Sequence, residues 1–128
     1  MENQFVAYTQ ALALKELLGF DEPCFCYFDN DKELRTCTGL NNWNNHSGFP
    51  YFVSAPLKQQ VLRWFREKYD LWFRPDYYDE MREYDYQGSI HQLGRHRSLA
   101  SLDNCKTVEE LEVKCIDKLI MLANDKMP

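Results

Sequence analysis

One segment near the C-terminus constrains the fold more than any other part of the chain. Its apolar residues repeat at helical spacing and form a single wide stripe: Val108, Leu111, Cys115, Ile116, Leu119, Ile120, Leu122 and Ala123. Thr107 and Glu110 stand at the spacing of a capping box, in which each side chain satisfies a free backbone donor at the start of a helix. A helix with so wide an apolar face packs against a sheet, so the rest of the chain must supply strands.

Two further segments predict helices. The first runs from Thr9, as the capping residue, to Leu18, and Gly19 can adopt the left-handed conformation that ends a helix. The second begins with Ser54 as its capping residue and ends near Tyr69. We expect its apolar face to be buried and its charged face to be wet, the two sets being Leu57, Val61, Trp64 and Phe65, and Lys58, Arg63, Arg66 and Glu67.

The segment between the first two helices favours strands. Residues 24–28 and 34–38 are rich in residues that suit strands, and a short polar link separates them, which is typical of a hairpin. Residues 41–48 form a polar, Asn-rich loop, and 51–53 can add a short third strand. The sequence therefore predicts two or three strands before the second helix.

The segment before the last helix gives a weaker pattern. Residues 71–73 predict a strand that Pro75 confines to a sheet edge. Residues 77–86 suit a strand pair, 88–93 are expected to be extended, and 94–104 are expected to be loop. The predicted class is α+β, with three helices packed on a small, mainly antiparallel sheet in the order α-β-β-(β)-α-β-β-α.

Length and composition support one globular domain. A chain of 128 residues can bury a core without disulfides or metals, and we expect a single domain over 1–128. Apolar residues make up 45% of the chain, which excludes intrinsic disorder. No apolar run is long enough to cross a membrane. The net charge of -5 is too small to indicate nucleic-acid binding.

The N-terminus and the cysteines favour the cytoplasm. The first residues include the acidic Glu2 and lack the apolar run of a signal peptide. Five cysteines are an odd number, so at least one thiol stays free, which is unusual in an oxidising compartment. Their spacing does not match a zinc site. We therefore expect a cytoplasmic protein with reduced, mostly buried cysteines and with no metal or cofactor.

Three segments resemble a known group of proteins. They are ALALKELLGFDEPCFCYF at 11–28, SAPLKQQVLRWFREKYDL at 54–71 and TVEELEVKCIDKLI at 107–120. In these segments the chain is similar to short, uncharacterised proteins encoded by phages and prophages of Bacteroidetes. The central segment is the most specific of the three. The resemblance implies a small accessory protein that acts inside a bacterial cell, and it carries no catalytic residue to this chain.

The densest group of cationic side chains is Arg95, His96 and Arg97, which closely follows His91. Two guanidinium groups with a titratable imidazole suit a phosphate or a nucleotide. The alternative is a loop whose charges only keep it solvated, since no Gly-rich phosphate-binding motif accompanies the group.

Two tryptophans are candidates for stacking on the base of such a ligand. Trp72 lies in the predicted edge strand, and Trp43 lies in the Asn-rich loop, where an exposed tryptophan would be uncommon. For Trp43 the alternative is a ring that closes its own loop over the core.

Tyrosines alternate with acidic residues between 76 and 86. The tyrosines are Tyr77, Tyr78, Tyr84 and Tyr86. Tyrosine gives a large contact area at low entropic cost, so this segment could form an edge that binds another protein. It could also be a weak mimic of nucleic-acid charge, or simply a half-exposed strand.

No catalytic motif of the common hydrolase, zinc-peptidase or nucleotide-hydrolase types is present. We therefore expect a non-enzymatic, phage-type binding module with no membrane contact. It would engage a host protein through the tyrosine segment, or sequester a host nucleotide signal through Arg95 and Arg97, as an anti-defence protein does. The alternatives are a small metal-dependent hydrolase or nuclease that uses carboxylates at 76–85, and a structural virion component that forms homo-oligomers.

Overall fold

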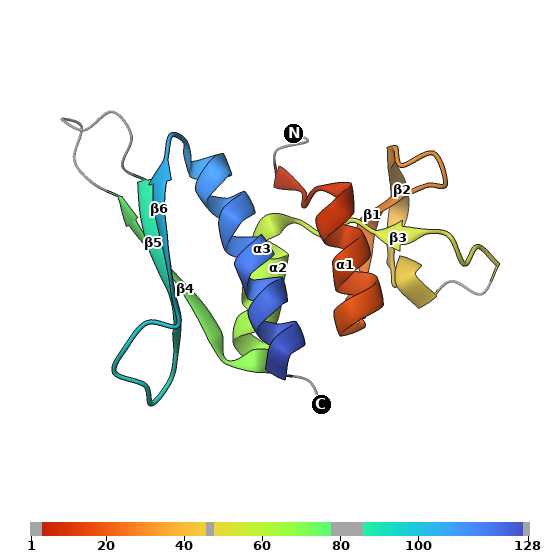
Figure 1. The fold of residues 1–128 in the computed structure, drawn as a ribbon. Coiled ribbons are helices and arrows are strands. Elements are labelled where there is room, and N and C mark those ends of the chain that lie inside the picture. The colour runs from red at the N-terminus through yellow and green to blue at the C-terminus, as the bar shows by residue number, and fades with distance from the viewer. Residues whose placement is uncertain (1–3, 46–47, 78–85, 127–128) are drawn as a thin grey trace. The chain divides into compact units, whose positions relative to one another are not determined.

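The computed structural model describes residues 4–45, 48–77 and 86–126. The chain forms two compact units, 1–58 and 59–128, and each combines helix with antiparallel sheet (Figure 1). The predicted α+β class is confirmed. The strands, however, lie in two three-stranded sheets, whereas the sequence predicts one sheet.

The first unit joins one helix to a sheet with strand order β2-β1-β3. Its elements are α1 (Tyr8–Leu18), β1 (Cys24–Phe28), β2 (Leu34–Asn41), the 3-10 helix η2 (Trp43–Asn45) and β3 (Val53–Ser54). The predicted hairpin is confirmed, because Phe28 of β1 faces Leu34 of β2 in an antiparallel pair. On its other side, β1 pairs with β3, where Phe28 faces Val53.

Local hydrogen bonds explain both ends of α1. Ala7 takes the capping position, two residues earlier than predicted, and its N–H donates to Oε1 of Gln10 at 3.3 Å. At the other end Gly19 has a φ of 64°, which confirms the predicted left-handed ending. The next N–H, that of Phe20, donates to the carbonyl of Leu14 at 3.0 Å. This turn directs the Phe20 side chain into the core, where it is buried.

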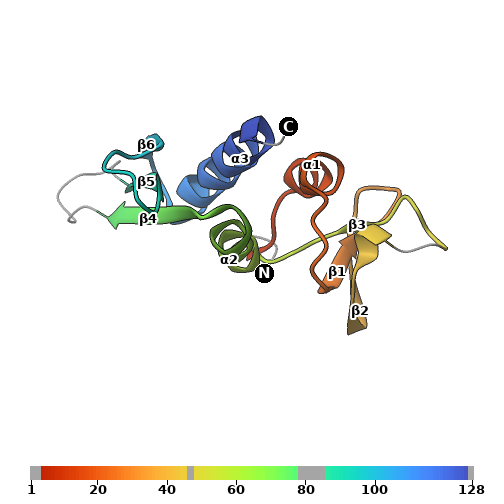
Figure 2. The same ribbon diagram turned by 90° about the horizontal axis from the view of Figure 1, so that it is seen from below.

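The second unit is a three-stranded meander with two helices. It contains α2 (Lys58–Tyr69, whose first residue is the last of the first unit), β4 (Leu71–Tyr77), β5 (Tyr86–Gln92), β6 (Ala100–Cys105) and α3 (Val108–Lys126). The strand order is β4-β5-β6, so β4 is an edge strand, as the position of Pro75 predicts. Figures 1 and 2 show α2 and α3 on the same side of this sheet.

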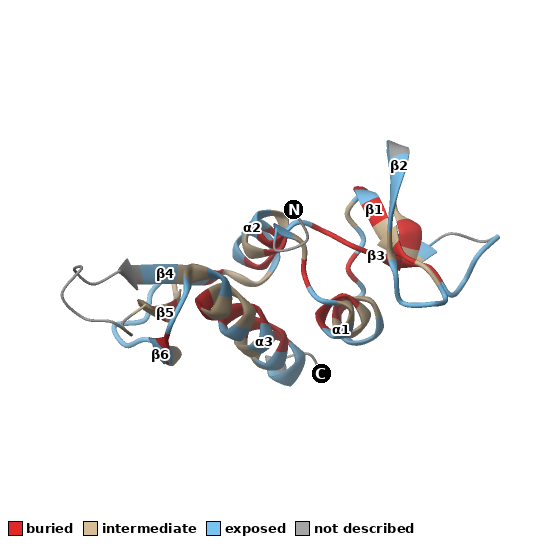
Figure 3. Ribbon diagram, turned by 90° about the horizontal axis from the view of Figure 1, so that it is seen from above, coloured by how far each residue is buried: buried red, intermediate tan, exposed pale blue. Residues whose placement is uncertain are grey.

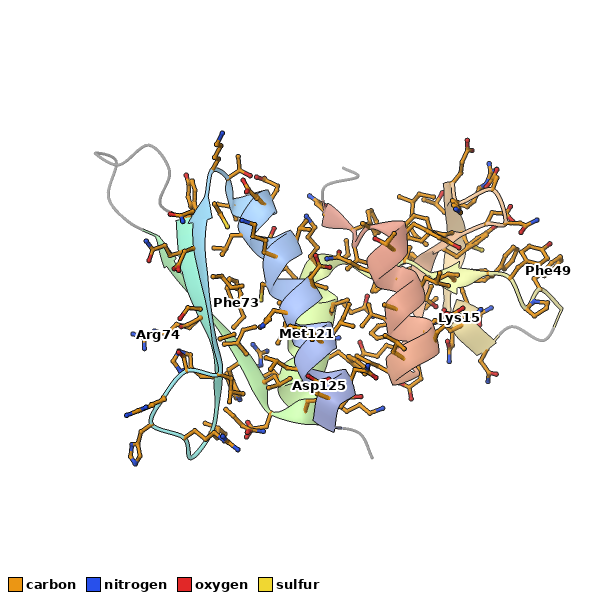
Figure 4. The ribbon with its side chains drawn as sticks, in the orientation of Figure 1. Lys15, Phe49, Phe73, Arg74, Met121 and Asp125 are labelled. Atoms are coloured by element: carbon orange, nitrogen blue, oxygen red, sulfur yellow. The ribbon has the colours of Figure 1, made fainter. Side chains whose placement is uncertain are left out.

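Side chains alternate between the two faces of this sheet. Leu71 and Ile90 are fully buried on the face that α3 covers. In Figure 4, Phe73 points towards α3 and its neighbour Arg74 points away from it. Buried positions of α3 follow the same side of the helix along its length (Figure 3). The opposite face of the sheet is therefore left without a covering helix in this unit.

The start of α3 confirms the predicted capping box in part. The N–H of Glu110 donates to Oγ1 of Thr107 at 3.1 Å, as expected. The Glu110 carboxylate, however, accepts from the N–H of Lys106 at 3.0 Å, one residue before the expected donor. This bond, with Lys114 nearby, lowers the pKa of Glu110. Among the helices that the structure describes, α3 included, none has the length and apolarity that a membrane span requires.

The predicted start of the second helix is wrong. Ser54 lies in β3 instead of capping a helix, and α2 begins only at Lys58. The reason is a closer partner: the N–H of Ser54 donates to Oδ1 of Asn44 at 2.7 Å, and the N–H of Asn44 donates to Oγ of Ser54 at 3.2 Å. Because the helix starts later, Leu57 lies before it and is exposed, while Lys58 is buried rather than wet.

The predicted loop over 94–104 is also wrong in its second half. Residues 100–105 form β6, which pairs with β5. Its residues are largely polar, and only Leu102 and Cys105 are fully buried. An extra residue on β6 shifts the register between Tyr86 and Gly88, and Asn104 there has a φ of 60°. This bulge breaks the alternation by which a strand is recognised in sequence.

All five cysteines carry free thiols. Four of them are buried and Cys37 is exposed, which agrees with the expectation of mostly buried cysteines. Burial raises the pKa of the Cys26, Cys105 and Cys115 thiols, so these groups stay protonated at neutral pH.

Candidate functional site

The uncovered face of the second sheet carries a row of polar and aromatic side chains. Trp72 and Arg74 are exposed on β4, and Ser89 and His91 lie opposite them on β5. Residues that face each other across an antiparallel pair project to the same side. Trp72 thus shares a face with His91, and Arg74 shares it with Ser89. Oγ of Ser89 lies 2.7 Å from Nε2 of His91, within hydrogen-bond distance, which orients the imidazole on this face.

Trp72 is exposed but held in place. Its side chain belongs to a residue with 40% exposure. The indole Nε1–H donates to Oδ1 of Asp70 at 2.7 Å, and the Arg66 guanidinium lies over the ring, 5.2 Å from its centroid. Asp70 has a φ of 57°, a left-handed conformation that Asp tolerates better than most residues. This tight junction between α2 and β4 gives the indole a fixed orientation without burying it.

Trp72 lines a hollow of about 490 Å³, which we call the Trp72 hollow. Arg74 and His91 line it from the sheet, and Arg95 lines it from the loop between β5 and β6. The loop is tied at both ends, because the N–H of Arg95 donates to the carbonyl of Gln92 at 3.2 Å and the N–H of Leu99 donates to that of Ile90 at 2.7 Å. The loop therefore has a fixed base beside Trp72.

A second hollow of about 330 Å³ adjoins the first, and we call it the Arg97 hollow. Gly94 and Arg95 line both hollows, whereas His96, Arg97 and Ser98 line only the second. Gly94 has a φ of 84°, which side-chain-bearing residues rarely adopt. This turn lets consecutive loop residues line two neighbouring hollows.

The two hollows are positively charged within a chain whose net charge is -5. Their lining residues all belong to the described part of the chain, and none of them is Asp or Glu. Arg74, Arg95 and Arg97 form no ion pair with any residue that the structure describes. The guanidinium donors are thus available to an anion, and the local charge favours one.

The structure brings some predicted site residues together and separates others. Trp72 and Arg95 line the same hollow, with His96 and Arg97 directly beside it. The prediction missed Arg66 and Arg74. Arg74 could have been found, because it stands two residues from Trp72 in a predicted strand and must share its face. Arg66 lies on a different element and needs the fold to bring it over the ring.

Trp43 belongs to the first unit and is part of its core. It is only 7% exposed, and its Nε1–H donates to the carbonyl of Cys24 at 2.8 Å. Its ring packs against Tyr27, with centroids 4.4 Å apart, and against Phe52 at 5.9 Å. This geometry agrees with the alternative in which the ring closes its loop over the core. We therefore leave Trp43 out of the candidate site.

The predicted tyrosine surface lies mostly outside the described residues. Tyr78 and Tyr84 fall there, and Tyr77 is described only by its backbone, which pairs with that of Tyr86 at the end of the β4-β5 ladder. The carboxylates between 79 and 85 also fall outside. Among residues that the structure describes, no group of three or more Cys, His, Asp or Glu could hold a metal ion. The partner surface therefore stays a prediction.

Phe49 is a second exposed aromatic, in the first unit (Figure 4). Its ring stacks on Phe52 at 4.8 Å, and the nearby Lys15 ammonium donates to the carbonyls of Pro50 and Phe52 at 2.8 and 2.9 Å. These bonds use the cation to hold the segment, so no free charge accompanies the ring. Comparison of the chain with protein-family models, with curated proteins and with solved structures finds no match.

Proposed function

We propose that this protein is a non-enzymatic module that binds a nucleotide in the Trp72 hollow. One observation carries the proposal: an exposed tryptophan held in a fixed orientation and two arginines without ion-pair partners line one hollow. Trp72 is the stacking surface for the base. Arg74 and Arg95 donate to the phosphate.

The chemistry of the lining favours a nucleotide over a simple anion. Stacking of a base on an aromatic side chain contributes about 1–3 kcal/mol, and hydrogen bonds from arginine to phosphate are charge-assisted and can be bidentate. A small anion would use only the arginines and leave the indole uncovered. A volume of about 490 Å³ is within the range of small-molecule sites.

Binding without turnover is the activity that we assign to this hollow. Its lining supplies hydrogen-bond donors and a stacking surface, and the imidazole of His91 is the one lining group with an ordinary pKa near neutrality. The resemblance to phage-encoded proteins suggests a setting for such binding, namely the sequestration of a nucleotide signal inside a host cell.

Isothermal titration of the full chain with AMP, GMP, CMP and UMP tests the proposal. We expect at least one of these mononucleotides to bind, and we expect Trp72→Ala to weaken its binding by about 1–3 kcal/mol, roughly 5- to 150-fold. Arg95→Ala should weaken it at least about tenfold, because a charge-assisted hydrogen bond is lost.

Arg63→Ala is the matched control. Arg63 is an exposed arginine of the same unit that pairs with Glu67 at 4.0 Å and lines neither hollow. This variant should bind as the unmodified chain does. If none of the four mononucleotides binds at millimolar concentration, or if Arg95→Ala binds as tightly as Arg63→Ala, the proposal is wrong.

A further inference from the structure

The contact between the two hollows says more about the ligand. Arg95 lines both of them, so a molecule whose phosphate reaches Arg95 from the Trp72 hollow arrives at the entrance of the Arg97 hollow. A nucleoside monophosphate ends at that point. The neighbouring hollow would then hold only water.

The lining of the Arg97 hollow indicates what can extend into it. Its side chains are those of Arg95, His96, Arg97, Ser98 and Leu99, and no aromatic ring is among these described residues. A second base would therefore find no stacking surface there. An anionic group would find two guanidinium groups, an imidazole and a hydroxyl, with no carboxylate among the lining residues.

We infer that the preferred ligand is a nucleotide with more than one phosphate group. This inference rests on the proposed nucleotide binding and assigns its ligand class. The base stacks on Trp72, the first phosphate contacts Arg95, and a further phosphate lies in the Arg97 hollow with Arg97 as its main donor. Arg95 occupies the boundary and serves both phosphates.

The division of the arginines gives a specific pattern of losses. Arg74 lines only the Trp72 hollow, and Arg97 lines only the Arg97 hollow. Removing Arg74 should weaken all nucleotides that share a base to a similar degree. Removing Arg97 should weaken only those nucleotides that carry the additional phosphate.

The experiment titrates GMP, GDP and GTP, and AMP, ADP and ATP, into the full chain and into Arg97→Ala and Arg74→Ala. With the unmodified chain, we expect the diphosphate to bind about tenfold or more tightly than the monophosphate with the same base. In Arg97→Ala that advantage should disappear while monophosphate affinity stays within about twofold. The exposed position of Arg97 in a loop makes the variant suitable for testing binding without disturbing the core.

Two results would overturn the inference, and they differ from a failure of nucleotide binding itself. If monophosphates bind as tightly as diphosphates, the Trp72 hollow is a nucleotide site but the Arg97 hollow does not extend it. If Arg97→Ala weakens GMP as much as GDP, Arg97 serves the first phosphate instead. If no nucleotide of either series binds, the proposed function has failed and the inference fails with it. Inorganic pyrophosphate, titrated in parallel, shows whether the base is needed.

Discussion

The two units use the same residue types in opposite ways. In the first unit Trp43 is buried and its N–H is satisfied by the Cys24 carbonyl, whereas in the second unit Trp72 is exposed and fixed by Asp70. The arginines differ in the same sense. Arg35 has three carboxylates within 4 Å, those of Asp29, Asp31 and Glu33, whereas the arginines that line the two hollows form no ion pair among the described residues.

This difference separates residues that stabilise the fold from residues that are available to a ligand. A side chain whose polar and apolar surfaces are already satisfied contributes to stability and has little left to offer. A side chain that is held in place but left open has already lost part of the entropy that binding would cost. The first unit is built from the former kind and the second unit exposes the latter, and substitutions in matched pairs can test the contrast.

The largest expected effect comes from the two tryptophans. Trp43→Ala should lower the free energy of unfolding by about 3–5 kcal/mol, because it removes a buried ring and leaves the Cys24 carbonyl without its donor. Trp72→Ala should lower it by no more than about 1 kcal/mol. Urea denaturation of both variants, followed by circular dichroism, measures the difference.

A milder variant keeps this prediction testable if Trp43→Ala does not fold. Trp43→Phe retains much of the packing against Tyr27 and Phe52 but loses the indole N–H, and it should cost about 1–3 kcal/mol. Equal costs for the substitutions at the two tryptophans would mean that Trp72 is also a core residue, and the contrast between the units would be lost.

Two glycines give the next largest effect. A Cβ at Gly88 of β5 would lie 2.6 Å from Cε1 of Phe73 and 3.1 Å from the carbonyl oxygen of Arg74, whereas a Cβ at Gly39 of β2 would meet nothing within 4 Å. We expect Gly88→Ala to destabilise the protein by about 1–3 kcal/mol. Gly39→Ala should change stability by less than about 1 kcal/mol. Thermal unfolding of the two variants decides this, and similar melting temperatures would contradict the packing of Phe73 under β5.

The smallest effect concerns the cap of α3 and depends on pH. The pKa of Glu110 is lowered from its ordinary value of 4.5, chiefly by the Lys106 N–H. The ionised carboxylate therefore stabilises the folded state above that value, and the contribution is lost as the pH falls through the lowered pKa. Glu110→Gln should be less stable than the unmodified chain at pH 7, and the gap should narrow towards pH 3. A gap that is constant with pH would show that the charge plays no part.

The elements with regular patterns could be predicted from the sequence, and those that depend on distant partners could not. The stripe of α3 and the left-handed Gly19 are local features, so the sequence determines them directly. The start of α2 failed because Ser54 bonds to Asn44, ten residues earlier in the chain. Strand β6 failed because the bulge at Asn104 interrupts its alternation.

The candidate site was predicted in part for the same reasons. Arg95 and Arg97 stand out as neighbours in the sequence, and Trp72 stands out as an aromatic residue in an edge strand. Nothing in the sequence places Trp72 beside the loop, because that requires the register of β4 and β5, in which Trp72 faces His91. The different fates of Trp43 and Trp72 likewise depend on what packs around each ring.

The most direct test of the proposed site follows the indole N–H signals of the full chain by NMR during titration with GDP and with ADP. Assignment by Trp43→Phe and Trp72→Phe identifies the two signals of interest. We predict that the Trp72 signal shifts with saturating nucleotide while the buried Trp43 signal stays in place, so that one spectrum contains both site and control. A Trp72 signal that does not move with either nucleotide, or that moves less than the Trp43 signal, would contradict nucleotide binding in the Trp72 hollow.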